Sequence, residues 1–352
     1  MDKKTVWYEQ QMKNSSFISM LFVMFFFLSC SPSEEKGVGA INKESAKVYI
    51  ETLANDNMEG RRAYTTGSLK AADYIADCLK DIGVAPYKES YFQDFETKDI
   101  DILEKGIKSH IIPEGETVRN IIGKIEGINK DEYVIVGAHY DHLGISAHQT
   151  EDSIYNGADD NASGVSAVLQ IAKAFIASKE KPLNTIIFAF WDAEEMGLVG
   201  SNCFVKSFSD MSQIKFYLNL DMIGRDNKDS SLQVAVLYSY TITNQEQFLK
   251  DKIEEYGLNI EIVSDVDSIN LNFTNNYFAD YMHLNKDFSM FKYNSDHAPF
   301  EAKNVSVFLF TTGLHNDYHE LSDHAEKINW EKLTDITKLS FITLFKFANR
   351  EM

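Results

Sequence analysis

The sequence is short of cysteine, and this shortage excludes one class of protein. The chain has 352 residues but only three cysteines, Cys30, Cys78 and Cys203. Three cysteines in a chain of this length do not make a disulfide framework. Cys78 and Cys203 fall within apolar helical patterns, so we expect two buried thiols and no bridge between them.

Basic residues are also scarce relative to acidic ones. Lysine and arginine total 34 against 53 aspartates and glutamates, so the net charge is 34 − 53 = −19. This balance argues against nucleic acid as a partner, because phosphate backbones attract lysine and arginine. It is compatible with a soluble, secreted or surface protein that binds a cation, such as a metal ion or the amino terminus of a peptide.

The apolar run near the amino terminus is too short to span a bilayer comfortably. It extends over residues 17–28, whereas a spanning helix needs about 20 apolar residues. With Lys13 in front of it, the run has the length of a signal-peptide core. Small residues directly before Cys30 resemble a bacterial lipobox, in which the cysteine is acylated. We therefore expect a lipoprotein signal over residues 1–30, a flexible tether over residues 31–40, and an exported protein held to the cell envelope only by lipid on Cys30. A plain secretory signal is the alternative.

Apolar runs and helical periodicity alternate along the rest of the chain. Runs such as residues 134–136 and 186–190 are typical of strands buried on both faces. We expect strands over residues 91–95, 120–125, 134–138, 186–191, 216–220 and 305–310, and helices over residues 43–57, 68–82, 163–175, 196–205, 245–256 and 328–348. This alternation predicts an α/β fold. Residues 41–352 would form one domain, with residues 226–293 as a candidate lid or substrate-side insertion.

Histidine and acidic residues follow the predicted strands. The clusters contain His139, Asp141, Asp159, Asp160, Glu194, Glu195, Asp221 and His319. Burial of such charges is costly unless they are paired or bind a metal. Adjacent carboxylates repel each other unless a cation lies between them. In an open α/β sheet, ligands bind at the carboxyl ends of the strands, which is where these residues are expected.

Five of these residues are candidate metal ligands: His139, Asp159, Glu195, Asp221 and His319. One zinc ion with an open position needs only three protein ligands. Five ligands suit two ions that share one carboxylate, an arrangement used for hydrolysis. Glu194 would then remain to take a proton from water and pass it to a leaving amine.

Six blocks of this sequence, in this order, resemble metallopeptidase family twenty-eight. They are AHYDH (138–142), NGADDNASG (156–164), DAEEMG (192–197), NLDMIG (219–224), SDHAPF (295–300) and DYHELSD (317–323). The family contains two-zinc aminopeptidases, glutamate carboxypeptidase-like enzymes and glutaminyl cyclases. The resemblance covers about residues 40–350 and implies a mixed, mainly parallel sheet between two layers of helices.

The resemblance also implies a ligand set. His139, Asp159 and Asp221 would bind one zinc ion. Asp159, Glu195 and His319 would bind the other, with Asp159 bridging the two. Other divalent metals suit such nitrogen and oxygen sites as well.

Further roles follow from the same resemblance. Glu194 would be the general base and acid, and Asp141 would orient His139. A cis peptide is expected after Asp159. Tyr293 and His297 are candidates for contact with the substrate or for stabilising an oxyanion.

Other polar residues are expected to lie outside the chemistry. We expect no role for His142, His148, His315 and His324. Arg61 and Arg62 either meet a substrate carboxylate or pin the amino-terminal segment, and pinning is favoured.

The function implied is a zinc-dependent exopeptidase that removes residues from the amino end of peptides. Glutaminyl cyclase-like, carboxypeptidase or dipeptidase activity in the same fold is the alternative within the enzymes. An inactive surface-binding lipoprotein is the alternative of another class. Proteins that keep this fold but have lost activity usually lack some of the metal ligands, whereas all five candidate ligands and Glu194 are present in this sequence.

Overall fold

The computed structural model describes residues 32–96, 116–147, 152–226, 233–238, 244–263 and 294–350. Cys30, His148 and Tyr293 lie outside these ranges. Within them the main sheet has nine strands in the order β1-β3-β7-β4-β8-β11-β9-β10, and β2 pairs with β3. The strands are β1 (Ala85–Pro86), β2 (Phe92–Glu96), β3 (Thr117–Ile125), β4 (Asn129–His139), β7 (Asn184–Trp191), β8 (Ile214–Leu220), β9 (Gln233–Tyr238), β10 (Glu261–Val263) and β11 (Val307–Thr311).

The centre of the sheet is parallel, and an antiparallel strand adjoins it on each side. β4 runs parallel to both β7 and β8, and β8 runs parallel to β11. β3 and β9 add antiparallel neighbours on the two sides. All eight residues of β7 are buried, as expected for a strand covered on both faces.

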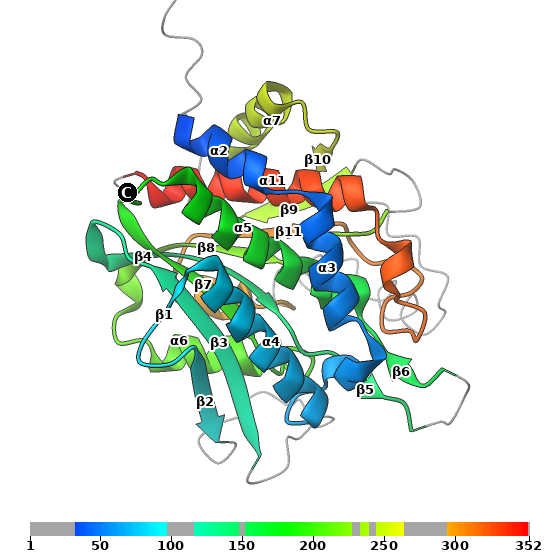
Figure 1. Ribbon diagram of the computed structural model, residues 1–352. Helices are drawn as coiled ribbons and strands as arrows, with labels where there is room; N and C mark the ends of the chain where they lie inside the picture. Colours follow the sequence, from blue (N-terminus) through cyan, green and yellow to red (C-terminus); the bar gives the residue numbers. More distant parts are fainter. Residues whose placement is uncertain are drawn as a thin grey trace, which may run out of the picture.

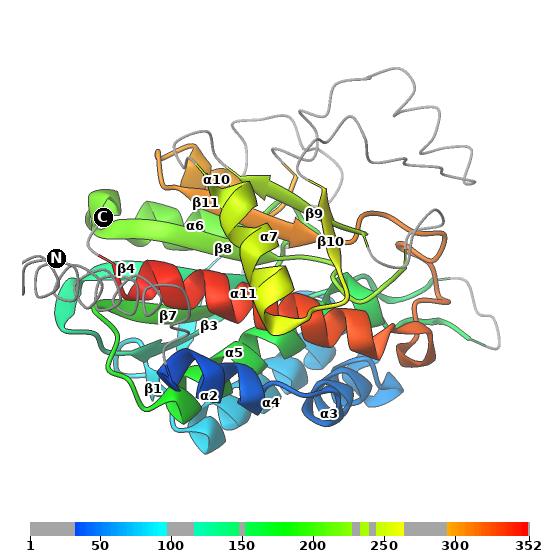
Figure 2. The same ribbon diagram turned by 90° about the horizontal axis from the view of Figure 1, so that it is seen from above.

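Helices cover both faces of this sheet (Figures 1 and 2). They are α2 (Pro32–Ala40), α3 (Lys43–Leu53), α4 (Thr66–Ile82), α5 (Gly164–Ser178), α6 (Val199–Ser207), α7 (Gln245–Tyr256), α10 (Ala298–Glu301) and α11 (Trp330–Ala348). The larger core cluster joins one face of the sheet to α2–α5 and α11. A second cluster packs Phe204 of α6 and Phe300 of α10 against the other face. The predicted α/β fold with a mixed, mainly parallel sheet between helices is therefore confirmed.

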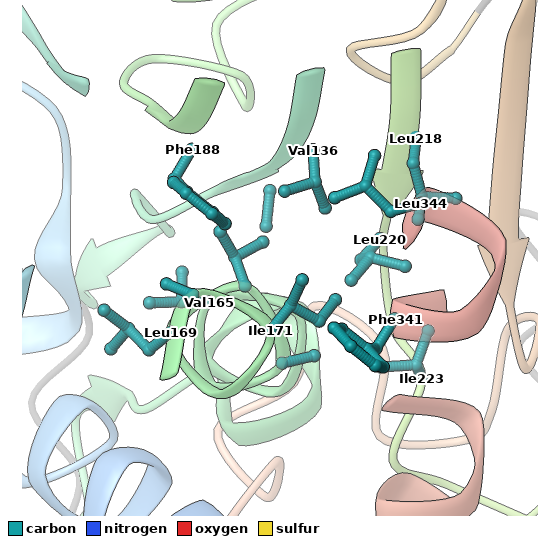
Figure 3. Close-up of a cluster of buried hydrophobic side chains, with 14 of the residues drawn as sticks. Val136, Val165, Leu169, Ile171, Phe188, Leu218, Leu220, Ile223, Phe341 and Leu344 are labelled. Carbon is teal, nitrogen blue, oxygen red and sulfur yellow. The ribbon is translucent and has the colours of Figure 1, made fainter. Parts of the chain in front are cut away.

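The larger core is centred on α5, which is apolar around most of its circumference. Figure 3 shows Val165 and Ile171 of this helix in one cluster with residues of the strands and of α11. Val136 of β4 and Phe341 of α11, both fully buried, belong to the same cluster. This packing fixes the helix that follows the site loop 158–163, so the loop is anchored at its carboxyl end.

Residues 32–40 correct one expectation, because they form α2 and not a flexible tether. Val38 is buried in the core, and a Cβ at Gly37 would lie 2.2 Å from the ring of Phe341. The carboxylate of Glu34 accepts hydrogen bonds from Lys252 at 2.7 Å and from Tyr256 at 2.9 Å. The acidic residues that suggested a solvated linker thus include one that binds α7, while small and apolar positions pack inward.

The described parts of residues 226–293 also differ from the expected lid. β9 pairs with β11 and β10 pairs with β9, so these strands extend the sheet. Residues 264–293 lie outside the described ranges. None of the helices in the described ranges is long and apolar enough to cross a membrane. Cys78 and Cys203 are free thiols, as predicted.

Candidate metal centre

The candidate site lies at the carboxyl ends of three neighbouring strands. β4 lies between β7 and β8 in the sheet. His139 is the last residue of β4, Glu194 and Glu195 follow β7, and Asp221 follows β8. Because parallel strands end on the same edge of a sheet, these four side chains reach one place.

A cavity of ≈ 100 Å³ opens at this edge. Four carboxylates and two histidines line it: Asp160, Glu194, Glu195, Asp221, His139 and His319. In the described part of its lining there is no lysine or arginine. So many buried carboxylates without a basic side chain need a cation to offset their repulsion.

One group of donors surrounds His139. Its Nε2 atom lies 3.3 Å from Oδ1 of Asp160 and 3.4 Å from Oδ1 of Asp221. Two ligands held at about 2.0–2.1 Å from a zinc ion in tetrahedral geometry lie roughly 3.3 Å apart. The spacing therefore suits one divalent ion among these three side chains.

A second group surrounds His319. Its Nε2 atom lies 3.2 Å from Oδ2 of Asp160 and 3.1 Å from Oε2 of Glu195. Asp160 thus directs one oxygen to each group. This is the arrangement expected of a carboxylate that bridges two ions.

Asp160, not Asp159, lies between the two donor groups, so the structure does not place Asp159 where a bridging carboxylate was expected. Oδ1 of Asp159 accepts a hydrogen bond from the Gly224 amide at 2.7 Å, and its Oδ2 lies 3.1 Å from Nε2 of His315. The cis peptide is Asp160–Asn161, one residue later than expected. Neighbouring residues in this non-helical loop point in different directions, and the run of two aspartates does not reveal which one faces the cavity.

No role was expected for His142 and His315, but His142 contacts the candidate metal centre and His315 contacts Asp159 beside it. Nδ1 of His142 lies 2.9 Å from Oε1 of Glu195, and its side chain is fully buried. His142, Asp160 and Glu195 also form a group whose ligand atoms lie within 4.8 Å of one another. His315 reaches the centre indirectly, because it holds Asp159. His142 is the last residue of the AHYDH block, and this position in the sequence could have indicated its contact with the centre.

The loop that carries Asp160 is fixed by its neighbours. Oδ2 of Asp323 accepts hydrogen bonds from the amides of Asp159 at 2.9 Å and Asp160 at 3.1 Å. Gly157 begins the turn at φ +55°, and a Cβ there would lie 2.1 Å from the carbonyl oxygen of Asp160. A side chain at residue 157 is thus excluded by both backbone conformation and space.

Asp141 ties two of the strand ends together. Its Oδ1 accepts from the amide of Glu194 at 3.0 Å, and its Oδ2 accepts from the amide of Glu195 at 3.3 Å. Nδ1 of His139 lies 3.2 Å from the carbonyl oxygen of Asp141 and 3.6 Å from its Oδ1. Asp141 thus contacts His139, as expected, and also sets the backbone of both glutamates.

Asp221 is held by hydrogen bonds that the sequence did not reveal. Ser295 donates from Oγ to Oδ2 of Asp221 at 2.6 Å, and Asn219 donates to Ser295 Oγ at 2.7 Å. Tyr217 donates its hydroxyl to Asn219 at 2.7 Å, and Trp191 donates to Tyr217 at 2.8 Å. This chain of polar contacts runs from the buried face of the sheet to the cavity.

Without a bound cation, the histidines carry the balancing charge. Burial opposes protonation of His319, but Glu195 and Asp160 raise its pKa to about 11. Burial likewise opposes ionisation of Glu195, yet His319 and His142 lower its pKa to about 2. Glu194 behaves differently, because burial raises the pKa of its carboxyl well above the ordinary range. It is the one glutamate of the pair that readily holds a proton.

His297 and Arg61 are not part of the described cavity lining. His297 is buried at the start of α10 and does not line the cavity, so the structure does not place it for contact with a substrate. Tyr293 lies outside the described residues. Arg61 pins the amino-terminal segment, because its guanidinium donates to four carbonyl oxygens at 2.7–2.9 Å. Burial lowers the pKa of this guanidinium to about 10.

Curated relatives match parts of the chain. An aminopeptidase of Pseudomonas aeruginosa is 36% identical over 198 residues, which are 55% of this chain and 33% of the relative. A probable leucine aminopeptidase 2 of Arthroderma benhamiae is 36% identical over 116 residues, 32% of this chain and 21% of the relative. The chain thus covers a fifth to a third of the length of these relatives.

Solved structures share the fold over most of the chain. A zinc aminopeptidase from Bacillus subtilis has a TM-score of 0.65 at 17% identity, over 88% of this chain and 96% of that one. A glutaminyl cyclase from Porphyromonas gingivalis has a TM-score of 0.61 at 16% identity, over 87% and 99%. The model of peptidase family M28 matches residues 120–343, which include the three strand ends, Asp160 and His319. This match covers more than half of the sequence, and the chain therefore belongs to peptidase family M28.

Proposed function

We propose that this protein is a metal-dependent exopeptidase, and more specifically an aminopeptidase that hydrolyses the first peptide bond of its substrate. The observation that carries the proposal is the position of Asp160 between two donor groups, with Oδ1 near His139 and Oδ2 near His319. Named relatives that are aminopeptidases support the same reading.

The residues suit two divalent ions. His139, Asp160 and Asp221 would hold one, and Asp160, Glu195 and His319 would hold the other. Zinc fits this set of imidazole and carboxylate donors, and other divalent ions can replace it. When bound, such a pair of ions lowers the pKa of a water molecule and polarises a carbonyl group.

Glu194 is the residue proposed to move protons. It lines the cavity beside both groups, and its raised pKa suits a group that accepts a proton from water and returns it to the leaving amine. The hydrogen bonds from both glutamate amides to Asp141 fix the backbone of this pair. Glu194 also lies in one group with His139 and Asp221, whose ligand atoms are within 4.8 Å of one another, so its carboxylate is close to the ion that these residues would hold.

The lining of the cavity favours the amino end of a peptide. Its carboxylates would attract a protonated α-amino group. Met222, Leu309 and Leu314 supply an apolar wall for the first side chain. The described lining of this cavity has no basic side chain that would repel that amino group.

Two alternatives are less well supported. Glutaminyl cyclase chemistry uses a related fold, but the adjacent Glu194 and Glu195 and the bridging position of Asp160 favour two ions and hydrolysis. A binding protein without activity does not explain why ligands and a spare carboxylate all converge.

We also propose that the protein acts outside the cytoplasm, anchored by lipid at Cys30, on peptides and not on nucleic acid. The support is the sequence of residues 17–30. The anchor is tested by growing cells with radioactive palmitate. We expect the wild type to be labelled and the Cys30→Ser variant to be exported without label.

The test of the activity is direct. Purified protein is stripped with a chelator, given zinc, cobalt or manganese, and assayed with leucyl-p-nitroanilide. We expect hydrolysis only after metal is added, and loss of about 10³-fold or more in kcat for Glu194→Gln with metal still bound. Absence of turnover on a broad panel of aminoacyl substrates would contradict the proposal.

A further inference from the structure

A second cavity, of ≈ 410 Å³, lies on the other side of Glu195 and His319. These two residues line both cavities. Beyond them, the second cavity is lined by Arg62, Leu143, Ile145, Tyr155 and Met196, among others. The candidate metal centre therefore borders two cavities, and of their described linings only that of the second contains an arginine.

The two adjacent arginines have different surroundings. Arg61 is 1% exposed, and its guanidinium donates hydrogen bonds to four backbone carbonyl oxygens. Arg62 lines the second cavity, and its guanidinium has no hydrogen-bond or ion-pair partner among the described residues. The expectation that both arginines pin the segment therefore holds for Arg61 only.

The backbone leaves room for the stem of Arg62. Gly144 stands at φ +84°, and a Cβ there would lie 2.7 Å from Cβ and 3.2 Å from Cδ of Arg62. Only a glycine allows this close contact in this conformation. The arginine side chain thus runs along the short strand β5 (Gly144–Ile145) at the cavity wall.

No acidic group in the described wall of the cavity is left for Arg62. Asp141 accepts from the amides of Glu194 and Glu195, and Glu195 is bonded to His142 and His319. Arg62 is half-buried, and a guanidinium that has no partner among the described residues suits a planar anion, because a carboxylate matches its fork of donors.

We propose that Arg62 binds a carboxylate on the leaving residue of the substrate, so that the protein prefers short peptides with an apolar first residue followed by a residue that carries a negative charge. This rests on the proposed function. The apolar wall of the first cavity takes the first side chain, and the leaving residue then extends past Glu195 and His319 into the second cavity. The carboxylate is either the free carboxyl terminus of a dipeptide or an acidic side chain at the second position.

The experiment compares kcat/KM of the metal-loaded protein on matched peptides. Leu-Ala against Leu-Ala-amide reports on the terminal carboxylate, and Leu-Glu-amide against Leu-Gln-amide reports on an acidic side chain. We expect at least one charged peptide to be preferred by about ten- to a hundredfold, the effect of a hydrogen bond to a charged group. Arg62→Gln should bring that ratio close to one, and Arg62→Lys should leave an intermediate ratio.

The control is Lys303→Gln, which removes one positive charge from an exposed position outside the described lining of both cavities. It should leave the ratio as in the wild type. Equal rates on charged and neutral peptides in the wild type, or a preference that survives in Arg62→Gln, would overturn this inference alone. If Arg62→Gln does not fold, an unchanged ratio in Arg62→Lys would overturn it instead. No hydrolysis of any peptide or of leucyl-p-nitroanilide would overturn the proposed function and this inference with it.

Discussion

Nδ1 of His142 lies 2.9 Å from Oε1 of Glu195, while the other oxygen of that carboxylate lies 3.1 Å from Nε2 of His319. The two histidines therefore contact different oxygens of one glutamate. Nε2 of His142 is buried without a hydrogen-bond partner in the described structure. A histidine that binds metal usually donates from its second nitrogen, so this arrangement favours His142 as a positioning residue that fixes Glu195.

Substitution of His142 should lower the affinity for one ion and leave the affinity for the other unchanged. Asparagine places an amide near the position of Nδ1 and glutamine near that of Nε2, so the two variants form a matched pair. We expect His142→Gln to lower the affinity for the ion that Glu195 would hold by about 10–100-fold, which is the usual effect of losing a group that orients a ligand. His142→Asn should stay closer to the wild type. Isothermal titration of the metal-free protein with zinc measures both, and equal affinities in the two variants and the wild type would refute the role.

Removal of the Ser295 hydroxyl should lower the affinity for the ion that Asp221 would hold. Ser295→Ala deletes the 2.6 Å hydrogen bond to Asp221 and leaves Asn219 without its acceptor. A hydrogen bond to a charged group contributes about 1.5–3 kcal/mol, so we expect at least about a tenfold loss of affinity for one ion. Competition with a zinc-binding dye measures this loss. Ser209→Ala, at an exposed position, serves as the control and should bind as the wild type does.

The metal-free protein should lose stability as the pH rises from 6 to 9. The pKa of His319 is raised to about 11 and that of Asp192 to about 8. Both groups hold more protons in the folded protein than in the unfolded chain. Their contribution to the free energy of unfolding therefore falls as the pH rises above their pKa values in the unfolded chain. Bound metal replaces the protons on the histidines, and the gain in Tm from zinc should therefore be larger at pH 8 than at pH 6. Thermal melts with and without zinc at both pH values check this, and a gain that shrinks with pH would contradict it.

Arg61 and Arg62 should differ sharply in their effect on folding. Arg61→Leu removes a guanidinium that satisfies four carbonyl oxygens in the interior, and we expect a cost of at least about 3 kcal/mol in the free energy of unfolding. The same substitution at Arg62 removes no hydrogen bond within the described structure and should cost less than about 1 kcal/mol. Urea unfolding of both variants tests the difference, and similar midpoints would show that Arg61 does not pin the segment.

Patterns of apolar residues predicted most of the sheet and its helices. Fully buried strands such as β7 leave long β-branched and aromatic runs, and α7 was predicted with the bounds that the structure has, Gln245–Tyr256. Helix α2 was missed because its residues look polar, and its burial depends on partners in α7 and α11 that are far away in the sequence. The short strands β9 and β10 were missed as well, although their residues are mostly apolar.

The site was predicted in outline but not in every residue. Strand ends place His139, Glu194, Glu195 and Asp221 on one edge, and this could be derived from the strands alone. The choice between Asp159 and Asp160 depends on the backbone of one loop, which a pair of identical residues does not disclose. Ser295 and Asn219 act through contacts across 76 positions of the chain, and local patterns carry no trace of such pairs.

The metal content of Asp160→Asn beside that of Asp159→Asn decides whether Asp160 bridges two ions. Both variants remove one negative charge, and they differ by one position. After metal loading and gel filtration, mass spectrometry of the metals should find about two ions per chain in the wild type and in Asp159→Asn, and no more than about one in Asp160→Asn. Asp160→Asn should also lose peptidase activity. Two ions in Asp160→Asn together with a loss in Asp159→Asn would contradict the account.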